Sequence, residues 1–369
     1  MIDDVEIPNS YLEALRSPFA EDWIAAMKEQ HSELLEKETW ELVDAPPDSN
    51  VISGRWVFNV KRDRSGNIER LKARWVGRGF TQKYGLDYDQ TFAPTSHLTS
   101  VRVVLTIAAI ENLEVYQLDI KTAFLNARLD PAITVYVEQP HGFAEIGQET
   151  KVCRLKKALY GLKEAPKEWH ETLKGWMLNN GFTVLRSDEL IYIKRSEDEF
   201  IVVLVHVDDM LVGSRGVGSL NKLIDTLRES FDLSAAKPVE YFLGIGITRD
   251  RGTKTICLQQ KQYIKEILRE FGMEDAHANR NPFPSYTQLY GPWRAINVTS
   301  YQCLVGKLLY LSRCSRPDIA AAVSVLCQFT SQPLECHWAL AKDVLRHLKG
   351  TLQYRLKLGG GSVSGASLR

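Results

Sequence analysis

Apolar positions along the chain fall into runs typical of strands and stripes typical of helices. The most informative run covers residues 201–213, where β-branched residues stand on both sides of the acidic pair Asp208-Asp209. This pattern predicts two short strands joined by a tight turn that carries both carboxylates. Hairpin turns more often use Asn-Gly or Asp-Gly, because those residues accept a positive φ. The acidic pair therefore suggests a chemical role.

Other runs outline the rest of the chain. Strand-like segments at 55–60 and 70–76, linked by turn residues 63–67, predict a basic hairpin. Further strands are expected to end at Asp119 and to cover 241–245. Helical spacing predicts helices at about 17–38, with Ser17 as its cap, at 99–112, within 159–182 with an end at Asn180-Gly181, and at about 220–231. Later apolar stripes at 263–271, 319–326 and 338–348 predict a mostly helical C-terminal third.

Length and composition indicate a globular protein with two or three subdomains. The chain has 369 residues, of which 44% are hydrophobic and 25% charged. Its longest apolar stretch, near 103–110, is far shorter than the ~20 residues of a membrane span. The acidic start is unlike a signal peptide, so we expect no membrane and an intracellular location. The six cysteines form no C-x-x-C motif, which argues against a zinc site or a disulfide framework.

Charge is unevenly distributed although the formal net charge is zero. The first fifty residues are rich in Asp and Glu, whereas residues 55–83 carry nine Lys and Arg side chains that include Lys61, Lys72 and Arg74. Such asymmetry is typical of a face that binds a polyanion.

The carboxylates suggest a metal-dependent reaction. Two adjacent like charges beside buried strands repel each other, and a bound cation would keep both ionised. Asp119, at the end of another expected strand, is a third candidate ligand. One Asp followed by an Asp-Asp turn suggests a divalent-metal site for phosphoryl transfer. The alternative is a solvated turn and an unrelated strand end.

Several motifs, taken in order, resemble the reverse transcriptase of copia-type LTR retrotransposons. The matching segments are 55–61, 72–82 (KARWVGRGFTQ), 87–94, 117–126 (QLDIKTAFLN), 159–163 (LYGLK), 207–209 (VDD), 242–245, 316–319 and 347–351. The resemblance extends from about residue 12 to residue 351. Many motifs in one order and spacing are far more specific than any single motif.

The resemblance implies an α+β fold of the right-hand polymerase type, with fingers, palm and thumb and a mostly helical C-terminal connection. The implied parts are an N-terminal helical lead-in (1–50), fingers (51–115), palm (116–235), primer-grip strand and thumb (236–300), and a helical connection toward a missing RNase H domain (301–358). The Gly- and Ser-rich tail, 359–369, is expected to be flexible. The chain resembles the polymerase portion of a Pol polyprotein alone.

The resemblance also assigns site residues. Asp119, Asp208 and Asp209 would be catalytic and would bind two Mg²⁺ ions, with Mn²⁺ as an alternative. The implied nucleotide-binding residues are Lys61, Lys72, Arg74, Phe124 (as a steric gate against ribose), Gly161 and Lys163, and the implied primer grip is Phe242, Leu243 and Gly244. A structural role is the alternative for each, and Trp56 and Trp75 are expected either to stack on template bases or to belong to the core.

The implied activity is that of an RNA-directed DNA polymerase, a nucleotidyltransferase. Its partners would be an RNA template, a DNA strand and primer, dNTP, and the retroelement proteins Gag, integrase and RNase H, in a cytoplasmic particle or the nucleus. The family usually carries Tyr or Phe two residues before the acidic pair, where this chain has His206. That departure favours, as a second hypothesis, an inactive nucleic-acid-binding remnant. A metal-dependent phosphatase or nuclease is a third hypothesis, which leaves the helical third unexplained.

Overall fold

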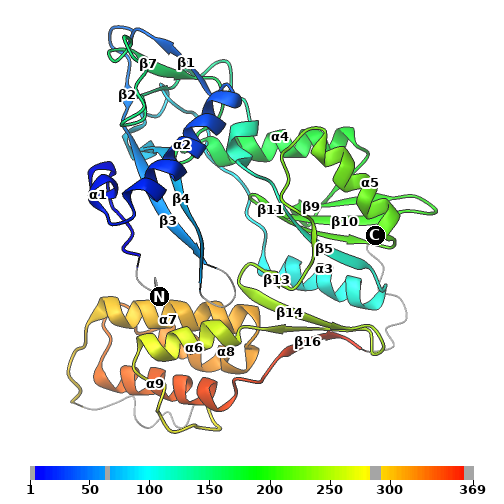
Figure 1. The fold of residues 1–369 in the computed structure, drawn as a ribbon. Helices are drawn as coiled ribbons and strands as arrows, with labels where there is room; N and C mark the ends of the chain where they lie inside the picture. Colours follow the sequence, from blue (N-terminus) through cyan, green and yellow to red (C-terminus); the bar gives the residue numbers. More distant parts are fainter. Residues whose placement is uncertain (1–4, 63–66, 283–291, 361–369) are drawn as a thin grey trace.

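The computed structural model describes residues 5–62, 67–282 and 292–360, and it shows an α+β protein (Figure 1). The expected fold class, a mixture of helices and sheets, is confirmed. Among the described residues the α-helices are α1 (Tyr11–Arg16), α2 (Ala20–Glu36), α3 (Leu98–Ile110), α4 (Ala165–Asn179), α5 (Val217–Arg228), α6 (Lys261–Glu270), α7 (Val298–Cys314), α8 (Ala320–Cys327) and α9 (Glu335–Gly350). Short 3-10 turns are η1 (Gly79–Thr81), η2 (Ala123–Asn126) and η4 (Pro317–Ile319).

The described strands form a central sheet and three smaller ones. The central sheet has the order β12 (Lys237–Pro238), β5 (Glu114–Asp119), β11 (Asp209–Ser214), β10 (Phe200–His206), β9 (Asp188–Arg195), β8 (Thr183–Leu185). A second sheet has the order β1 (Trp40–Val43), β7 (Val152–Leu155), β6 (Tyr136–Val137), β2 (Val51–Ile52). The others are β13 (Tyr241–Phe242), β14 (Ile245–Asp250), β15 (Thr255–Gln259), β16 (Leu356–Gly359), and the hairpin β3 (Gly54–Arg62), β4 (Ile68–Gly77).

The central sheet is buried on both faces, which explains its continuous apolar run. On β10, Val203 and Val205 face one hydrophobic cluster, which contains α4 and α5. Val202 and Leu204 face the other, which contains α3. Because side chains alternate along a strand, a strand between two helical layers needs apolar residues at every position. The predicted hairpin of 201–213 is confirmed.

The basic hairpin is also confirmed as β3 paired with β4. Its turn residues 63–66 lie outside the described residues. Trp56 and Trp75 are paired across the hairpin and their rings are in edge contact, with 2% and 1% exposure. Of the two roles considered for these tryptophans, the structure therefore supports the core, because a buried ring has no face open to a base.

Several expected boundaries were wrong. The first predicted helix begins at Ala20 rather than Ser17, since Ser17 ends the preceding helix α1, which the pattern did not predict. The helix predicted within 159–182, with its end at Asn180-Gly181, is confirmed as α4, which begins at Ala165. The predicted strand of 241–245 is broken by a turn at Leu243 and Gly244, whose φ values are 47° and 73°. That turn folds β13 back onto β14.

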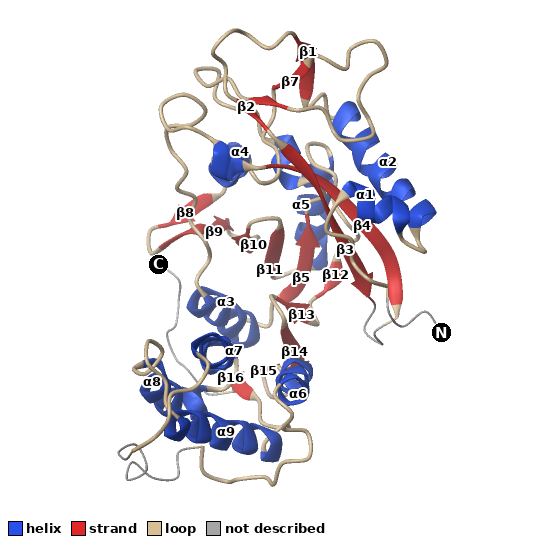
Figure 2. Cartoon of the chain, turned by 90° about the vertical axis from the view of Figure 1, so that its left-hand side faces the viewer, coloured by secondary structure: helices blue, strands red, loops and turns tan. Residues whose placement is uncertain are grey.

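The C-terminal third is mostly helical, as expected, and lies below the rest of the molecule in Figures 1 and 2. Helices α6 to α9 share a third hydrophobic cluster. Strand β16 then returns to pair with β15, so Gly359, expected in the flexible tail, ends a strand instead. The tail residues 361–369 lie outside the described part. None of the helices in the described residues is long and apolar enough to cross a membrane.

Candidate active site

The three acidic residues predicted to be catalytic meet at one edge of the central sheet. Strand β5 pairs with β11 so that Asp119 lies directly opposite Asp209. In an antiparallel pair, opposed residues have Cβ atoms about 4.5–5.5 Å apart. Asp208 lies in the adjoining turn, and its carbonyl oxygen accepts a hydrogen bond of 3.0 Å from the Ile120 N–H. Residues about 90 positions apart are thereby held together by backbone pairing.

The turn between β10 and β11 has an unusual backbone. Val207 has a φ of 59°, a left-handed conformation that is rare for a β-branched residue and is typical of strained functional sites. Two contacts hold the turn. The Trp169 indole of α4 donates a hydrogen bond of 2.6 Å to the Val207 carbonyl. The His206 Nδ1 and the Ser96 hydroxyl lie 2.8 Å apart.

The acidic residues are electrostatically costly where they stand. Burial raises the pKa of Asp119, and the neighbouring Asp208 charge raises it further, while Lys72 opposes both effects. Burial likewise raises the pKa of Asp209, although its hydrogen bond from Gln117 acts in the other direction. Carboxylates with raised pKa values that face one another favour a proton or a cation between them.

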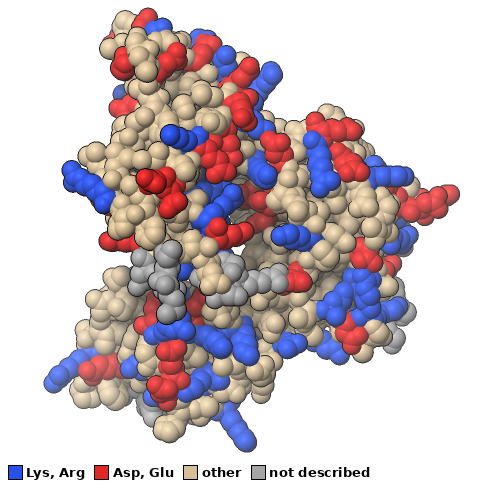
Figure 3. Space-filling model, viewed as in Figure 1, with Lys and Arg blue, Asp and Glu red and all other residues tan. Residues whose placement is uncertain are grey.

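Asp119 and Asp208 line a cavity of about 170 Å³ between the central sheet, α2 and β4. Lys72 and Arg74 of β4 line its other wall. Burial lowers the pKa of Lys72, and the charges of Arg74 and Arg70 lower it further. Clustered cations opposite clustered carboxylates suit a ligand that carries phosphates and a metal ion. In the view of Figure 3 the surface is hollowed near its middle, and basic and acidic side chains both lie on the rim of this hollow.

Tyr160 connects two of the predicted nucleotide-binding residues. Its ring lies against Phe124, with centroids 4.7 Å apart, and beneath the guanidinium of Arg74 at 5.0 Å. Tyr160 also lines the cavity of the aspartates, whereas Phe124 lines a neighbouring apolar cavity beside the Val207 turn. Tyr160 belongs to the motif at 159–163, and no role was predicted for it.

Gly161 has a clear structural requirement. Its φ is 89°, and a Cβ at this position would lie 2.2 Å from the Gly77 carbonyl oxygen. The Gly79 N–H donates a hydrogen bond of 3.2 Å to the Gly161 carbonyl in return. The Gly161 backbone therefore packs against the backbone at the end of β4, and its predicted role in nucleotide binding stays a prediction.

The predicted residues Lys61, Lys163, Phe242 and Leu243 do not line the cavity of the aspartates. The Lys163 ammonium donates to the Tyr88 hydroxyl at 3.0 Å and lies 4.4 Å from the centre of its ring, so it is held by the 79–95 segment. Lys61 is exposed on β3, opposite Arg70. Phe242 is buried with 1% exposure, and the Leu243 carbonyl accepts a hydrogen bond of 2.6 Å from Tyr310.

The donor set fits a hard cation, because the converging side chains offer oxygen atoms only. The carboxylates are not gathered into a finished site, however. Within the described part of the chain, no group of three or more His, Cys, Asp or Glu side chains is arranged to hold a metal ion. The Asp209 carboxylate accepts a hydrogen bond of 3.1 Å from Gln117 instead.

Exposed aromatic side chains gather in the segment that follows β4, and sequence reasoning missed them as candidates. Phe80, Tyr84 and Phe92 are 78%, 75% and 81% exposed. Exposed aromatic rings beside Arg78 and Lys83 are typical of surfaces that bind single-stranded nucleic acid. The aromatic and basic residues interspersed in 78–84 could have indicated this surface. The stacking of template bases was instead considered for Trp56 and Trp75, which are buried.

Comparison with known proteins identifies the class to which this fold and site belong. Residues 37–285 match the family described as reverse transcriptase (RNA-dependent DNA polymerase). The chain therefore belongs to this family.

Its relatives include retrotransposon polyproteins of plants, which confirms the copia-type resemblance. The chain is 38% identical to the retrovirus-related Pol polyprotein from transposon TNT 1-94 of Nicotiana tabacum, over 98% of this chain and 28% of that protein. It is 36% identical to the corresponding polyprotein from transposon RE1 of Arabidopsis thaliana, over 96% of this chain and 24% of that protein. The chain thus spans about a quarter of the length of these relatives.

A similar solved structure is that of the foamy viral protease-reverse transcriptase in complex with double-stranded DNA. Its TM-score is 0.48 at 14% identity, over 88% of this chain and 48% of that one.

Proposed function

We propose that this chain is the RNA-directed DNA polymerase of a copia-type retrotransposon, which transfers a nucleotide from a dNTP to a primer 3′-hydroxyl. The observation that carries the proposal is the pairing of Asp119 opposite Asp209, with Asp208 in the same turn and Lys72 across the cavity. In this assignment β3 and β4 belong to the fingers, the central sheet to the palm, and the helical third to the thumb and connection.

Asp119 and Asp208 would hold the divalent ions, with Asp209 in a supporting position. Bound Mg²⁺ would stabilise the negative charge that develops on the attacking and leaving oxygens during phosphoryl transfer. Two carboxylates in one cavity explain why a cation would bind there.

Lys72 and Arg74 would bind the triphosphate from the β4 wall. Arginine offers two parallel donors to a phosphate, and a lysine already burdened by neighbouring cations gains from an added anion. Tyr160, between Arg74 and Phe124, would position the sugar end of the nucleotide, so that Phe124 acts as the steric gate through this ring contact. Lys61 would add a further positive charge to this wall. Its charge acts on Asp119, whose pKa it lowers.

The template and primer would lie along different elements. Phe80, Tyr84 and Phe92 offer exposed rings to template bases, and Gly161 and Lys163 fix the segment that carries them. The turn at Leu243 and Gly244 would support the primer strand, anchored beneath by the buried Phe242. Gag, integrase and RNase H would be supplied by the remainder of the retroelement.

A primer-extension assay tests the proposal. The protein is given an RNA template, an annealed DNA primer, dNTPs and Mg²⁺. We expect extension by the natural sequence and a loss of more than about a hundredfold in rate for Asp208→Asn, because removal of a carboxylate ligand removes transition-state stabilisation. Asp198→Asn, an exposed loop substitution, is the control and should extend normally. Equal extension by Asp208→Asn would contradict the proposal.

The alternative is a nucleic-acid-binding remnant without turnover. This alternative is favoured by His206, which stands where the family usually has Tyr or Phe, and by the hydrogen bond from Gln117 to the Asp209 carboxylate. Under this alternative the natural sequence binds primer-template tightly but extends nothing. The substitution His206→Tyr then shows whether His206 causes the lack of extension, since restored extension would assign the defect to that residue.

A further inference from the structure

A second cavity, separate from that of the aspartates, is lined by basic side chains from two chain segments. It has a volume of about 520 Å³ and lies between residues 128–134 and β7 with the residues that follow it. We call it the β7 pocket. Its charged lining residues are Arg128, Arg154, Lys156 and Lys157, against the acidic Glu38 and Asp130. Nothing in the proposed polymerase mechanism uses these cations.

Backbone pairing forces two of the cations together. Arg128 and Lys157 are directly opposite each other in an antiparallel bridge. Hydrogen bonds on both sides fix this bridge, from the Leu129 N–H to the Lys156 carbonyl at 3.2 Å and from the Ala158 N–H to the Ala127 carbonyl at 2.9 Å. Like charges directly opposed across a strand pair are destabilising. The fold therefore keeps an unfavourable pair of charges that an anion would relieve.

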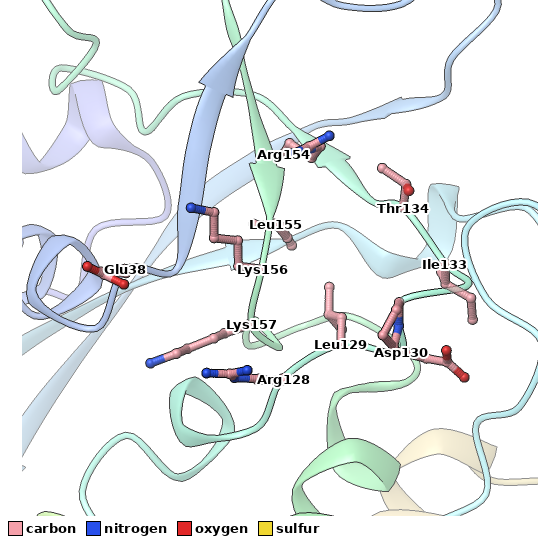
Figure 4. A pocket seen from close by; sticks show the side chains of 11 residues that line it. Glu38, Arg128, Leu129, Asp130, Ile133, Thr134, Arg154, Leu155, Lys156 and Lys157 are labelled. Atoms are coloured by element: carbon pink, nitrogen blue, oxygen red, sulfur yellow. The ribbon is translucent and has the colours of Figure 1, made fainter.

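The neighbouring carboxylates only partly offset the charge of this pair. In the described part of the chain, neither Arg128 nor Lys157 forms an ion pair, whereas Arg154 and Lys156 share Glu41. Asp130 accepts a hydrogen bond of 2.9 Å from the Ala132 N–H and points to the opposite end of the pocket in Figure 4. Figure 4 shows the Arg128 and Lys157 head groups side by side, with Glu38 facing them from another element.

The electrostatics agree with this geometry. Burial lowers the pKa of Lys157, and the charges of Lys37 and Arg128 lower it further, while Glu38 only partly opposes them. A cation in such surroundings has a surplus of positive neighbours, and a bound anion would remove this excess.

The pocket lies close to the candidate active site. Helix α2 contributes Glu33 to the aspartate cavity, and Glu38, just beyond the end of the same helix, lines the β7 pocket. Between them Lys37 forms an ion pair of 2.5 Å with Asp232, whose carbonyl accepts a hydrogen bond from the Lys121 N–H.

We infer that the β7 pocket is a second phosphate-binding site, which takes a phosphate group of a nucleic-acid strand or of a free nucleotide through Arg128 and Lys157. Arginine matches the geometry of phosphate with two donors, and lysine adds a point charge. The inference goes beyond the proposed polymerase function and does not require catalysis.

The test uses the full chain with Arg128→Gln and Lys157→Gln combined. The matched control is Arg228→Gln with Lys222→Gln, one arginine and one lysine exposed on α5. Binding of fluorescent single-stranded RNA is followed by anisotropy over a salt series without divalent ions. We expect about a tenfold weaker affinity near 0.1 M salt for the pocket variant and a salt slope lower by about 1.4, since each phosphate contact on a single strand contributes ~0.7. In the control, the loss of RNA affinity and the fall in salt slope should each be less than half of those in the pocket variant.

A second arm separates the two sources of phosphate. Inorganic tripolyphosphate binding is measured by calorimetry for the same proteins. Weaker RNA binding with unchanged tripolyphosphate binding assigns the pocket to a nucleic-acid strand, and the reverse assigns it to a free nucleotide. If the pocket variant matches the control in both arms, the inference is overturned, and binding of an acidic peptide alone would overturn it too.

Two measurements keep the result distinct from misfolding and from the polymerase proposal. Removing opposed like charges should leave the thermal midpoint of the pocket variant equal to or above that of the natural sequence. Extension at saturating primer-template should persist in the pocket variant. If the natural sequence never extends a primer, and the pocket variant loses the anion binding that the natural sequence has, the polymerase proposal is wrong and the pocket inference is supported.

Discussion

Asp119 combines burial with a facing negative charge, so its ionised form is unfavourable in the folded protein. A raised pKa means that the folded state binds a proton more tightly than the unfolded chain. Stability therefore falls as pH rises from the ordinary value of 3.8 through the raised folded pKa. The charge of Asp119 is tolerated for function rather than for stability.

Asp119→Asn should raise the thermal midpoint at pH 7 by about 1–3 °C, because the substitution removes the repelled charge at nearly constant shape. The gain should shrink as pH falls toward 3.8. Scanning calorimetry from pH 4 to 7 measures it, with the exposed Asp198→Asn as the control. Added Mg²⁺ should raise the midpoint of the natural sequence more than that of the variant. A variant less stable at pH 7 would show that Asp119 is a structural residue.

Gly161 shows how one residue sets the distance between two elements. Its positive φ and the nearby Gly77 carbonyl oxygen leave no room for a side chain. Gly161→Ala should therefore destabilise the protein by about 2–3 kcal/mol, from backbone strain plus displacement of the end of β4. Urea unfolding measures the change. Gly175→Ala in α4, where a Cβ meets open space, should instead stabilise by up to about 1 kcal/mol. Equal effects of the two would contradict this account.

Helix α4 holds the acidic turn through a single indole. Trp169 donates to the carbonyl of the strained Val207, whereas Trp176 on the same helix donates to the Ser230 hydroxyl at 3.0 Å. Trp169→Phe and Trp176→Phe should each cost about 1 kcal/mol of stability, because each removes one hydrogen bond. Trp169 is a positioning residue on the proposed function, so only its substitution should lower kcat, by about tenfold, with KM for dNTP little changed.

Steady-state extension kinetics distinguish the two tryptophans. A parallel fall in kcat for both variants would indicate general loosening of α4 rather than control of the turn.

The described residues form three hydrophobic clusters, and a buried polar network lies beside the third. Arg316, with 2% side-chain exposure, pairs with Asp318 at 2.6 Å, and His347 of α9 lies 3.0 Å from the same carboxylate. The Arg316 guanidinium also donates to the Thr351 hydroxyl at 2.5 Å. This network ties the end of α9 to η4, the short turn between α7 and α8.

Burial opposes ionisation of Asp318, but hydrogen bonds from Arg316 and His347 hold its pKa below the ordinary value of 3.8. The network therefore stabilises the folded state above that pH and loses its contribution as pH falls through the lowered pKa. Asp318→Asn should cost about 2–3 kcal/mol at pH 7, because it leaves a buried arginine without its charge partner. The deficit should narrow toward pH 3.

Hydrogen exchange locates the effect. Amides of α7, α8 and α9 should exchange faster in Asp318→Asn, while β10 and β11 stay protected, if the third cluster opens as its own unit. Asp225→Asn, in an exposed pair with Arg228 at 3.5 Å, is the control and should cost less than about 0.5 kcal/mol. Uniform exchange across both regions would show a single cooperative unit.

Local pattern was sufficient for much of this protein. The acidic turn, the basic hairpin, the strand that ends at Asp119 and the helices α6, α8 and α9 follow from short-range periodicity, whereas α7 was not predicted; the motifs in order identify the family. The small sheet of β1, β7, β6 and β2 was not predicted, because its strands are two to four residues long and lie far apart in the chain. Periodicity needs longer runs than these.

Long-range pairing decided the remainder. Apolar character alone does not distinguish Trp56, buried by its partner across the hairpin, from Phe80, which the chain leaves in solvent. Nor does it show that Lys163 turns toward Tyr88 or that Arg128 meets Lys157. The sequence specifies the chemistry of each side chain. Which charges face each other depends on the backbone register between distant segments, and this register exists only in the folded chain.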